Sequence, residues 1–118
     1  MRRMDVTIHG IKACDTMKKA RAWLDARRVA YAFHDYKTSG VARETLETWV
    51  RQVGWETLLN RAGTTFRKLR DDQKVDLTEA KAIVLMLAQP SLIKRPVLDV
   101  GGRLVVGFRP EVYGATFR

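Results

Sequence analysis

The chain has 118 residues, of which 46% are hydrophobic and 30% are charged. This balance is typical of one globular domain that buries a core without disulfides. No apolar run is long enough for a transmembrane helix, and the start, Met1-Arg2-Arg3-Met4-Asp5, lacks the hydrophobic segment of a secretion signal. We therefore expect a cytoplasmic protein without a membrane partner. A reducing compartment would keep its one cysteine available for reaction.

The net charge of +9 raises the question of nucleic-acid binding. The lysine and arginine residues are spread along the whole chain, without a dense basic run or the interleaved aromatic residues of single-strand binders. No helix-turn-helix pattern or zinc-ligand spacing is present. We interpret the charge as a basic surface that attracts small anionic substrates, and we predict no specific nucleic-acid partner.

The first third of the chain predicts a strand, a helix and a second strand. Apolar residues alternate around Val6 and Ile8, and apolar residues at helical spacing then predict a helix over 15–28. Alternating small and aromatic residues predict a strand over 30–36, followed by a turn at 37–40. The strand-helix-strand order predicts a right-handed crossover and a parallel pair.

Residues 41–90 are predicted to be mostly helical. One helix carries an apolar stripe that Gly54 ends, and short helices are expected over 55–60 and from a Thr64 or Thr65 cap to Leu69. A stronger helix opens at 77–79 and stops before Pro90. Its predicted apolar face is formed by Ala80, Ile83, Val84 and Leu87. Because no linker-like segment bounds this block, we treat it as an insertion within a single domain of residues 1–118.

The last third predicts a hairpin and a helix. Two apolar runs, 97–100 and 103–108, are joined by Gly101-Gly102, which is typical of a tight antiparallel turn. Arg109-Pro110 then predicts the start of a short final helix. The order βαβ, helical insertion, ββα indicates an α/β fold with a thioredoxin-like mixed four-stranded sheet.

Cys14 is the candidate nucleophile. A helix that begins at or just after Cys14 would place the sulfur near unpaired backbone N–H groups and the positive end of the helix dipole. Lys12 and Lys18 add positive charge nearby. Both effects favour the thiolate and lower the pKa of the cysteine. The alternative is a small buried residue without chemistry, and the strand-loop-helix setting favours the catalytic interpretation.

Three separated segments, residues 10–20, 94–96 and 107–111, resemble the arsenate reductase-like family of bacterial thioredoxin-fold proteins, and within it the YffB-type branch. The resemblance covers nearly the whole chain. It implies a thioredoxin-like fold and a redox-active cysteine at Cys14. It also implies a cis Arg95-Pro96 bond that shapes the backbone beside the sulfur, although an X-Pro bond is trans by default.

The same resemblance assigns anion binding to Arg95 and Arg109. Planar, permanently charged guanidinium groups suit an arsenate or a glutathione carboxylate, because they bind two oxygens at once. The alternative is that both are ordinary surface arginines. We predict an anion site from Lys12, Arg95, Pro96 and Arg109, without a metal.

Two positions depart from the family pattern. A third anion-binding arginine of the arsenate reductases falls at Asn60, and Arg61 is no simple replacement, because one helical step turns a side chain by about 100 degrees. The histidine that precedes their cysteine falls at Gly10, with His9 displaced by one position. These departures leave arsenate reduction open. His9 is either a tuning group or structural, and no role is assigned to His34.

Met17 occupies the position of a second cysteine in a Cys-x-x-Cys motif, so the resolving thiol must come from outside. Glutathione as an external cosubstrate, with glutaredoxin as a further donor, agrees with the family, and no bound cofactor is expected. The sequence thus predicts a glutathione-dependent thiol-disulfide reductase or arsenate reductase-like oxidoreductase. The alternative is a non-enzymatic Spx-type regulator that binds RNA polymerase. With Met17 in this position, the chain lacks the Cys-x-x-Cys redox switch of those regulators. A role in partner binding that does not depend on redox chemistry stays open.

Overall fold

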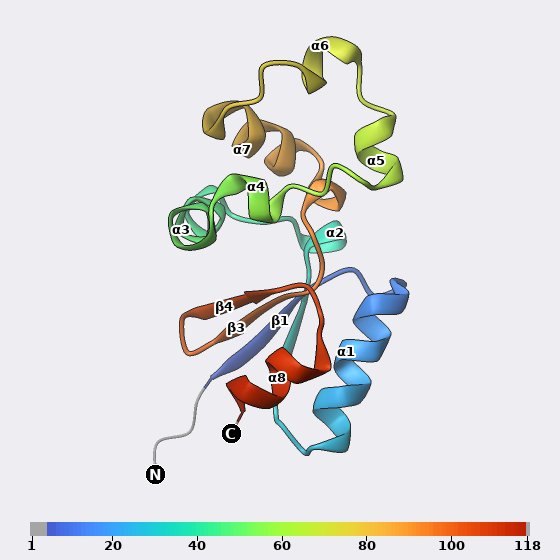
Figure 1. The fold of residues 1–118 in the computed structure, drawn as a ribbon, viewed down its shortest axis with the longest axis vertical. Helices are drawn as coiled ribbons and strands as arrows, with labels where there is room; N and C mark the ends of the chain where they lie inside the picture. Colours follow the sequence, from blue (N-terminus) through green and yellow to red (C-terminus); the bar gives the residue numbers. More distant parts are fainter. Residues whose placement is uncertain (1–4, 118) are drawn as a thin grey trace. The chain divides into compact units, whose positions relative to one another are not determined.

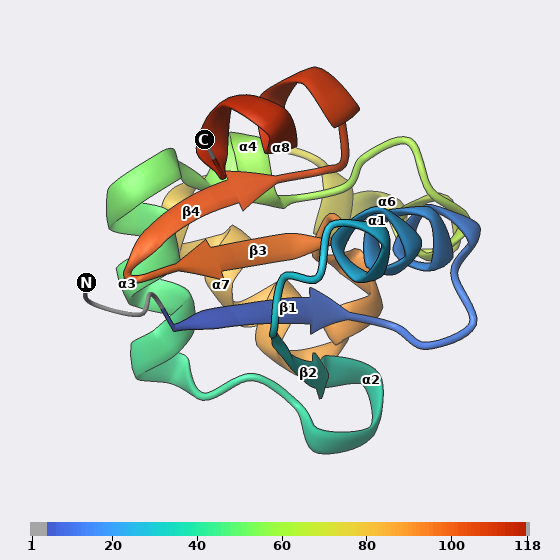
Figure 2. The same ribbon diagram turned by 90° about the horizontal axis from the view of Figure 1, so that it is seen from below.

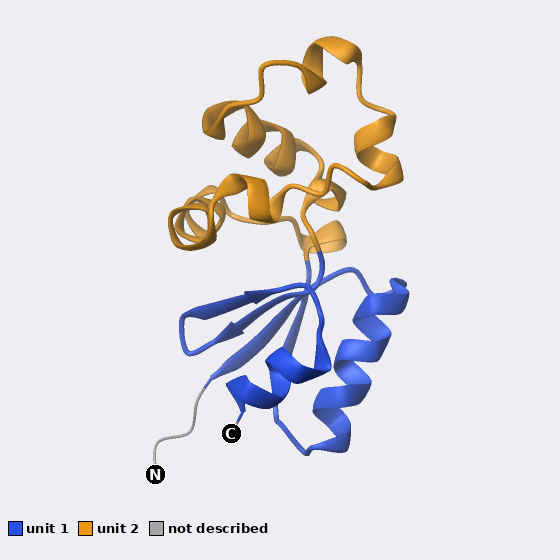
Figure 3. Ribbon diagram, in the orientation of Figure 1, with its two compact units in different colours: residues 1–35, 95–118 blue, residues 36–94 orange. Residues whose placement is uncertain are grey.

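The computed structural model describes residues 5–117, which form two compact units (Figure 3). The first, here called the sheet unit, combines the part of the chain up to Asp35 with the part from Arg95 onwards. The second, the helical unit, is Tyr36–Lys94. The predicted insertion, residues 41–90, falls inside the helical unit, and its membership of a single domain stays a prediction.

The sheet unit contains a mixed four-stranded sheet, as predicted (Figures 1 and 2). Its strands are β1 (Val6–Gly10), β2 (Ala32–Asp35), β3 (Val97–Val100) and β4 (Arg103–Val106), in the order β2-β1-β3-β4. β1 and β2 are parallel, whereas β3 is antiparallel to both β1 and β4. The central pair therefore joins a strand from near the start of the chain to one from its last quarter.

Two helices pack on one face of this sheet, α1 (Asp15–Ala26) and α8 (Pro110–Thr116) (Figure 1). Alternate strand residues meet them, because successive side chains of a strand point to opposite faces. The buried members of this core are Val6, Ile8, Met17, Ala20, Leu24, Leu98, Val100 and Tyr113. α1 ends two residues earlier than predicted, and Arg28 then adopts a left-handed φ of 57°.

Tyr113 lies at the centre of an aromatic cluster in this core. Its ring meets Trp23 edge to face at 5.5 Å between centroids and Phe108 at 4.8 Å, with interplanar angles of 89° and 85°. Phe117 packs against Trp23 at 6.0 Å. Each such pair contributes about 0.5–1.5 kcal/mol beyond the burial of its area. The cluster therefore fixes α8 against α1.

Removing the Tyr113 hydroxyl should not destabilise the protein. The ring is fully buried, and its oxygen has no hydrogen-bond partner among the described residues; the same burial raises the pKa of Tyr113 well above its usual value. An unpaired buried hydroxyl costs about 1–3 kcal/mol. We therefore expect Tyr113→Phe to leave the free energy of unfolding unchanged or to raise it by up to about 2 kcal/mol, as measured by urea denaturation.

Tyr36→Phe is the matched control for this prediction. The Tyr36 ring is equally buried, but its hydroxyl donates to the Ile93 carbonyl at 2.8 Å. This variant removes a formed hydrogen bond and leaves a carbonyl underpaired, so it should lose about 1–2 kcal/mol. Equal losses in Tyr113→Phe and Tyr36→Phe would show that the Tyr113 hydroxyl also has a partner.

The helical unit consists of short helices around its own core. They are α2 (Tyr36–Ser39), α3 (Arg43–Val53), α4 (Trp55–Leu58), α5 (Thr64–Arg67), α6 (Asp71–Lys74), α7 (Glu79–Ala88) and the 3₁₀ helix η1 (Pro90–Leu92). As predicted, α3 ends at Gly54, which has a φ of 87° that favours glycine. Backbone hydrogen bonds of 2.7–2.8 Å join the α4 end to the η1 end, from Lys94 to Leu58 and from Asn60 to Leu92.

Three predictions for the helical unit are wrong. The second strand stops at Asp35, because Tyr36 starts α2 instead of ending the strand. The predicted turn over 37–40 is therefore mainly the single helical turn of α2. Neither threonine caps α5, whose N-cap is Gly63, and α6 was not predicted at all.

The predicted apolar face of α7 is correct for Ile83 but wrong for Ala80 and Val84. The helix buries Ala82, Ile83, Leu85 and Met86, whereas Ala80 and Val84 are exposed. α7 is apolar on most of its circumference, so two stripes have helical spacing and only tertiary packing distinguishes them. α7 starts within the predicted segment 77–79, and Thr78 caps it by accepting a hydrogen bond from the Lys81 N–H at 3.2 Å.

The predicted C-terminal hairpin and helix are confirmed, although β4 ends at Val106, two residues before the end of the predicted run. Gly101 and Gly102 join β3 to β4 with positive φ values of 59° and 94°, which a type I′ turn requires. α8 begins at Pro110, with Arg109 as its N-cap. Within residues 5–117, no helix combines the length and the apolar character needed to cross a membrane.

Candidate functional site

Cys14 is the N-cap residue of α1. Its backbone is extended, with φ −89° and ψ 132°, and its carbonyl accepts the first helical hydrogen bond from Lys18 at 3.0 Å. Its own N–H donates to Ile11 at 3.3 Å, which closes the loop after β1. At an N-cap the side chain faces the free N–H groups of the second and third helical residues, here Thr16 and Met17. The half-buried thiol therefore lies where a serine or aspartate would cap a helix.

The surroundings of Cys14 stabilise its thiolate. Burial alone raises the pKa of the thiol, but hydrogen bonding from the Met17 N–H, the Arg95 side chain and the Thr16 N–H, together with the Arg95 charge, lowers it below the ordinary value. The Cys14 side chain accepts no fully formed capping hydrogen bond from these N–H groups. The N–H groups therefore act on the sulfur as an electrostatic attraction, which strengthens when the sulfur becomes charged. A larger thiolate fraction near neutral pH follows.

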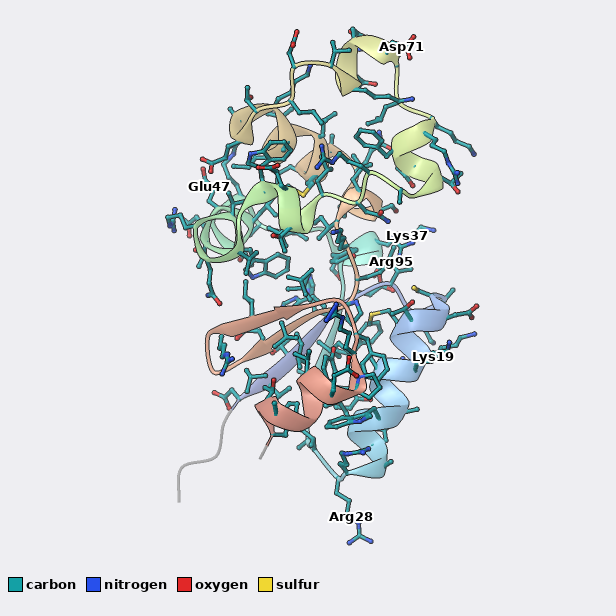
Figure 4. The ribbon with its side chains drawn as sticks, viewed as in Figure 1. Lys19, Arg28, Lys37, Glu47, Asp71 and Arg95 are labelled. Atoms are coloured by element: carbon teal, nitrogen blue, oxygen red, sulfur yellow. The ribbon has the colours of Figure 1, made fainter. Side chains whose placement is uncertain are left out.

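Arg95 reaches Cys14 from a distant part of the sequence. Arg95, labelled in Figure 4, directly precedes β3 and is half-buried. Its hydrogen-bonding group and its positive charge both lower the pKa of the Cys14 thiol. The Arg95-Pro96 bond is cis, as the resemblance implied. Pro96 is buried, and its carbonyl accepts a hydrogen bond from Gly107 at 2.8 Å, which ties the segment before β3 to the end of β4.

Lys12 and Arg109 are both exposed in the sheet unit. Lys12 lies in the loop between β1 and Cys14, and Arg109 is the N-cap of α8. The groups that lower the pKa of Cys14 are Met17, Thr16 and Arg95. The anion-binding roles of Lys12, Arg95, Pro96 and Arg109 therefore all stay predictions. Asn60 belongs to the helical unit, where its side-chain oxygen accepts a hydrogen bond from the Ala62 N–H at 3.2 Å.

The sequence of residues 9–116 matches the model of the ArsC family. The chain belongs to the ArsC family. A solved structure titled YffB protein is 65% identical and has a TM-score of 0.92, over 96% of this chain and 99% of that one. An arsenate reductase (ArsC) related protein from Brucella melitensis is 56% identical, with a TM-score of 0.79 over 100% and 98% of the two chains. The global transcriptional regulator Spx of Streptococcus mutans is 30% identical over 90% of this chain and 78% of its own.

The resemblance to arsenate reductase-like proteins, and the thioredoxin-like fold that it implied, are thus confirmed. The relatives carry two kinds of name, reductase and regulator. The chemistry of this ArsC family member must therefore be argued from its own residues.

His9 lies on the other face of the sheet from α1. It pairs with His34 across the parallel strands, and the two rings meet at 5.2 Å with an interplanar angle of 62°. Burial and the neighbouring His34 lower the pKa of His9 to about 4, against a smaller opposite effect of Asp99. His9 is therefore neutral near neutral pH and adds no positive charge to the site.

His9 should make the stability of this ArsC family protein depend on pH. Its pKa is about 4 in the folded state and 6.5 in the unfolded state, so between these values the unfolded chain binds more protons. The stability that neutral His9 contributes is fully present above pH 6.5 and is lost as the pH falls toward 4. After allowance for solvent screening we expect a loss on the order of 1 kcal/mol at pH 5.

Urea denaturation at pH 7 and pH 5 measures this loss. His9→Gln removes the titrating ring, so its stability should differ less between the two pH values than that of the unmodified chain. An unchanged difference would assign the acid sensitivity to other groups.

One contact in the site was missed by sequence reasoning. Gly10 at the end of β1 is buried, and the Met17 side chain fills the space beside it. At position 10, where the arsenate reductases have a histidine, the Met17 side chain therefore occupies the space that a side chain would need. The only signal in the sequence was the pairing of a glycine with a long apolar residue one turn into the next helix. Among residues 5–117, no group of three or more His, Cys, Asp or Glu side chains is arranged to hold a metal ion.

Proposed function

We propose that this ArsC family protein is a glutathione-dependent thiol-disulfide reductase with Cys14 as its nucleophile. The single observation that carries the proposal is the Cys14 thiol at the N-cap of α1, with its pKa lowered by backbone N–H groups and by Arg95. A low-pKa, partly exposed thiol is the form of cysteine that attacks disulfides.

The first step is attack of the Cys14 thiolate on one sulfur of a disulfide. A Cys14 mixed disulfide forms, the original S–S bond breaks, and the other half leaves as a thiolate that takes a proton from water. With Met17 in place of a second cysteine, a glutathione thiolate then attacks the mixed disulfide. Cys14 is released as a thiolate, and the substrate half leaves as its disulfide with glutathione. Glutaredoxin is a suitable enzyme to reduce that product.

Positive charge near Cys14 supports an anionic cosubstrate. Arg95 lowers the pKa of the Cys14 thiol, and Lys12 and Arg109 belong to the same sheet unit. Glutathione carries two carboxylates, which guanidinium groups bind in pairs of hydrogen bonds. Reduced glutathione is abundant in reducing compartments, which agrees with a cytoplasmic location. Arsenate is a second anionic substrate, but Asn60 and Gly10 stand in place of an arginine and a histidine of the arsenate reductases.

The test is the pH dependence of Cys14 alkylation by iodoacetamide, with and without glutathione. Because only the thiolate reacts, the midpoint of the rate profile gives the pKa of Cys14. A midpoint below the unperturbed value of about 8.5, with saturable protection by glutathione, is expected. An ordinary or raised midpoint without protection would refute the proposal.

A regulatory role is the second candidate, because the Spx regulator of Streptococcus mutans matches over 90% of this chain. Such a role would not depend on the thiol, since Met17 replaces the second cysteine of a redox switch. A stable complex with RNA polymerase that is unchanged in Cys14→Ser would favour the regulator. Turnover of small disulfides that is lost in the same variant would favour the enzyme.

A further inference from the structure

The Gly10–Met17 contact joins β1 to the first turn of α1. A Cβ atom on Gly10 would overlap Sδ of Met17 and lie 2.7 Å from its Cε and 3.1 Å from its Cγ. Met17 is fully buried. The end of the Met17 side chain thus occupies the space that a side chain at position 10 would need. No larger residue fits at position 10 while Met17 keeps its place.

Met17 is also the only buried residue in the first turn of α1. Of its first five residues, Asp15–Lys19, only Met17 is buried and the other four are exposed. The next buried residue is Ala20, one turn further along. Packing that restrains the first turn of α1 therefore acts mainly through Met17, because exposed side chains contribute little restraint.

The same residue provides an N–H group to the Cys14 sulfur. Met17 is the third residue of the helix, and its N–H is among the donors that stabilise the thiolate. The side chain and the N–H share one Cα atom, so a rotation or shift of the first turn that frees the side chain also moves the N–H. Electrostatic stabilisation by such donors depends on their being held in place beforehand.

We propose that Met17 is a positioning residue for Cys14: its side chain, seated against Gly10 of β1, holds the first turn of α1 with its N–H groups directed at the sulfur. The inference rests on the proposed function, because it explains how the reactive thiol is maintained. It differs from a general effect of the helix dipole, which would not depend on the residue at position 10.

Gly10→Ala tests the contact directly. The added methyl group displaces the end of the Met17 side chain. Because Met17 is fully buried in a packed core, we expect this displacement to shift the first turn of α1 and to raise the alkylation midpoint of Cys14. At a pH below that midpoint the rate with iodoacetamide should fall about threefold or more, because it is proportional to the thiolate fraction. Gly114→Ala is the matched control: it adds one methyl group to α8, where a Cβ meets nothing within 4 Å, and should leave the rate unchanged.

Combining Gly10→Ala with Met17→Val supplies the rescue. Valine has one side-chain heavy atom fewer than methionine and alanine has one more than glycine, so the double variant restores the total size of the pair. It should recover most of the rate lost in Gly10→Ala. Met17→Val alone leaves a gap at the contact and should also slow the alkylation of Cys14. This single variant therefore tests the inference if Gly10→Ala does not fold.

Two outcomes would overturn the inference: a Gly10→Ala profile that matches the unmodified chain, or a double variant that stays as slow as the single one. Either can occur while the unmodified protein keeps its low midpoint and its protection by glutathione, which leaves the proposed function standing. An ordinary midpoint in the unmodified protein would instead refute the proposed function.

Discussion

Replacing Cys14 with serine is expected to abolish the glutathione-dependent reduction of small disulfides, with a loss of at least about 10³-fold. A serine hydroxyl is not deprotonated by the surroundings that favour the Cys14 thiolate, and it forms no mixed disulfide. The fold should be retained, because serine is nearly isosteric with cysteine and the position is only half-buried. We expect the free energy of unfolding to change by no more than about 1 kcal/mol.

The measurements are the turnover rate with glutathione in excess and the urea midpoint of the same preparation. The unmodified protein blocked with iodoacetamide provides a second control, since it carries the same fold with its sulfur capped. Turnover in Cys14→Ser above that of the blocked protein would remove Cys14 from the mechanism.

The second large effect is expected at Arg95. Arg95→Gln removes the guanidinium group whose hydrogen bonding and charge lower the pKa of Cys14, so the pKa of the thiol should rise. Because both groups are partly exposed, we expect alkylation by neutral iodoacetamide at pH 6.5 to slow by roughly 3- to 10-fold. Arg95→Lys should keep part of the rate, since it retains the charge but not the planar guanidinium.

Arg103→Gln is the charge-matched control. Arg103 is an exposed residue at the start of β4 in the same unit, so its loss changes the net charge equally without touching the sulfur. The alkylation profile of this variant should match that of the unmodified chain. Equal slowing in Arg95→Gln and Arg103→Gln would show that only the overall charge matters, and it would contradict the local role of Arg95.

The sheet unit was more predictable than the helical unit, for physical reasons. Alternation in β1, the paired glycines between β3 and β4, and Pro110 at the start of α8 are local signals that the backbone must obey. Helical spacing also predicted α1 and α3. In these segments local preference and tertiary packing agree.

Where the local sequence pattern was ambiguous, tertiary contacts determined which residues are buried and where an element ends. The apolar circumference of α7 did not indicate which side would be buried, and Val84 is exposed although its spacing suited the predicted face. Tyr36 was expected at the end of a strand, but it starts α2, and its hydroxyl donates a hydrogen bond to the Ile93 carbonyl, 57 residues later in the sequence. No local pattern encodes such a partner.

The candidate site was predictable in part. A helix start at Cys14 followed from local pattern, whereas the pairing of Cys14 with Arg95 entered only through family resemblance. Met17 was noted for lacking a thiol, and its packing against Gly10 could not be inferred, because a glycine in sequence does not reveal which side chain fills its space.

The separation of Cys14 from Arg95 has a consequence for synthesis of the chain. β1 and α1 are made before the helical unit, whereas Arg95 and β3, the antiparallel neighbour of β1, follow only after the whole of Tyr36–Lys94 has been made. A nascent chain that ends before β3 carries Cys14 without its guanidinium partner and with one edge of β1 unpaired. The environment of the nucleophile is thus completed only by a segment made after the helical unit, and a chain that lacks this segment carries a thiol that is slower to react with oxidants.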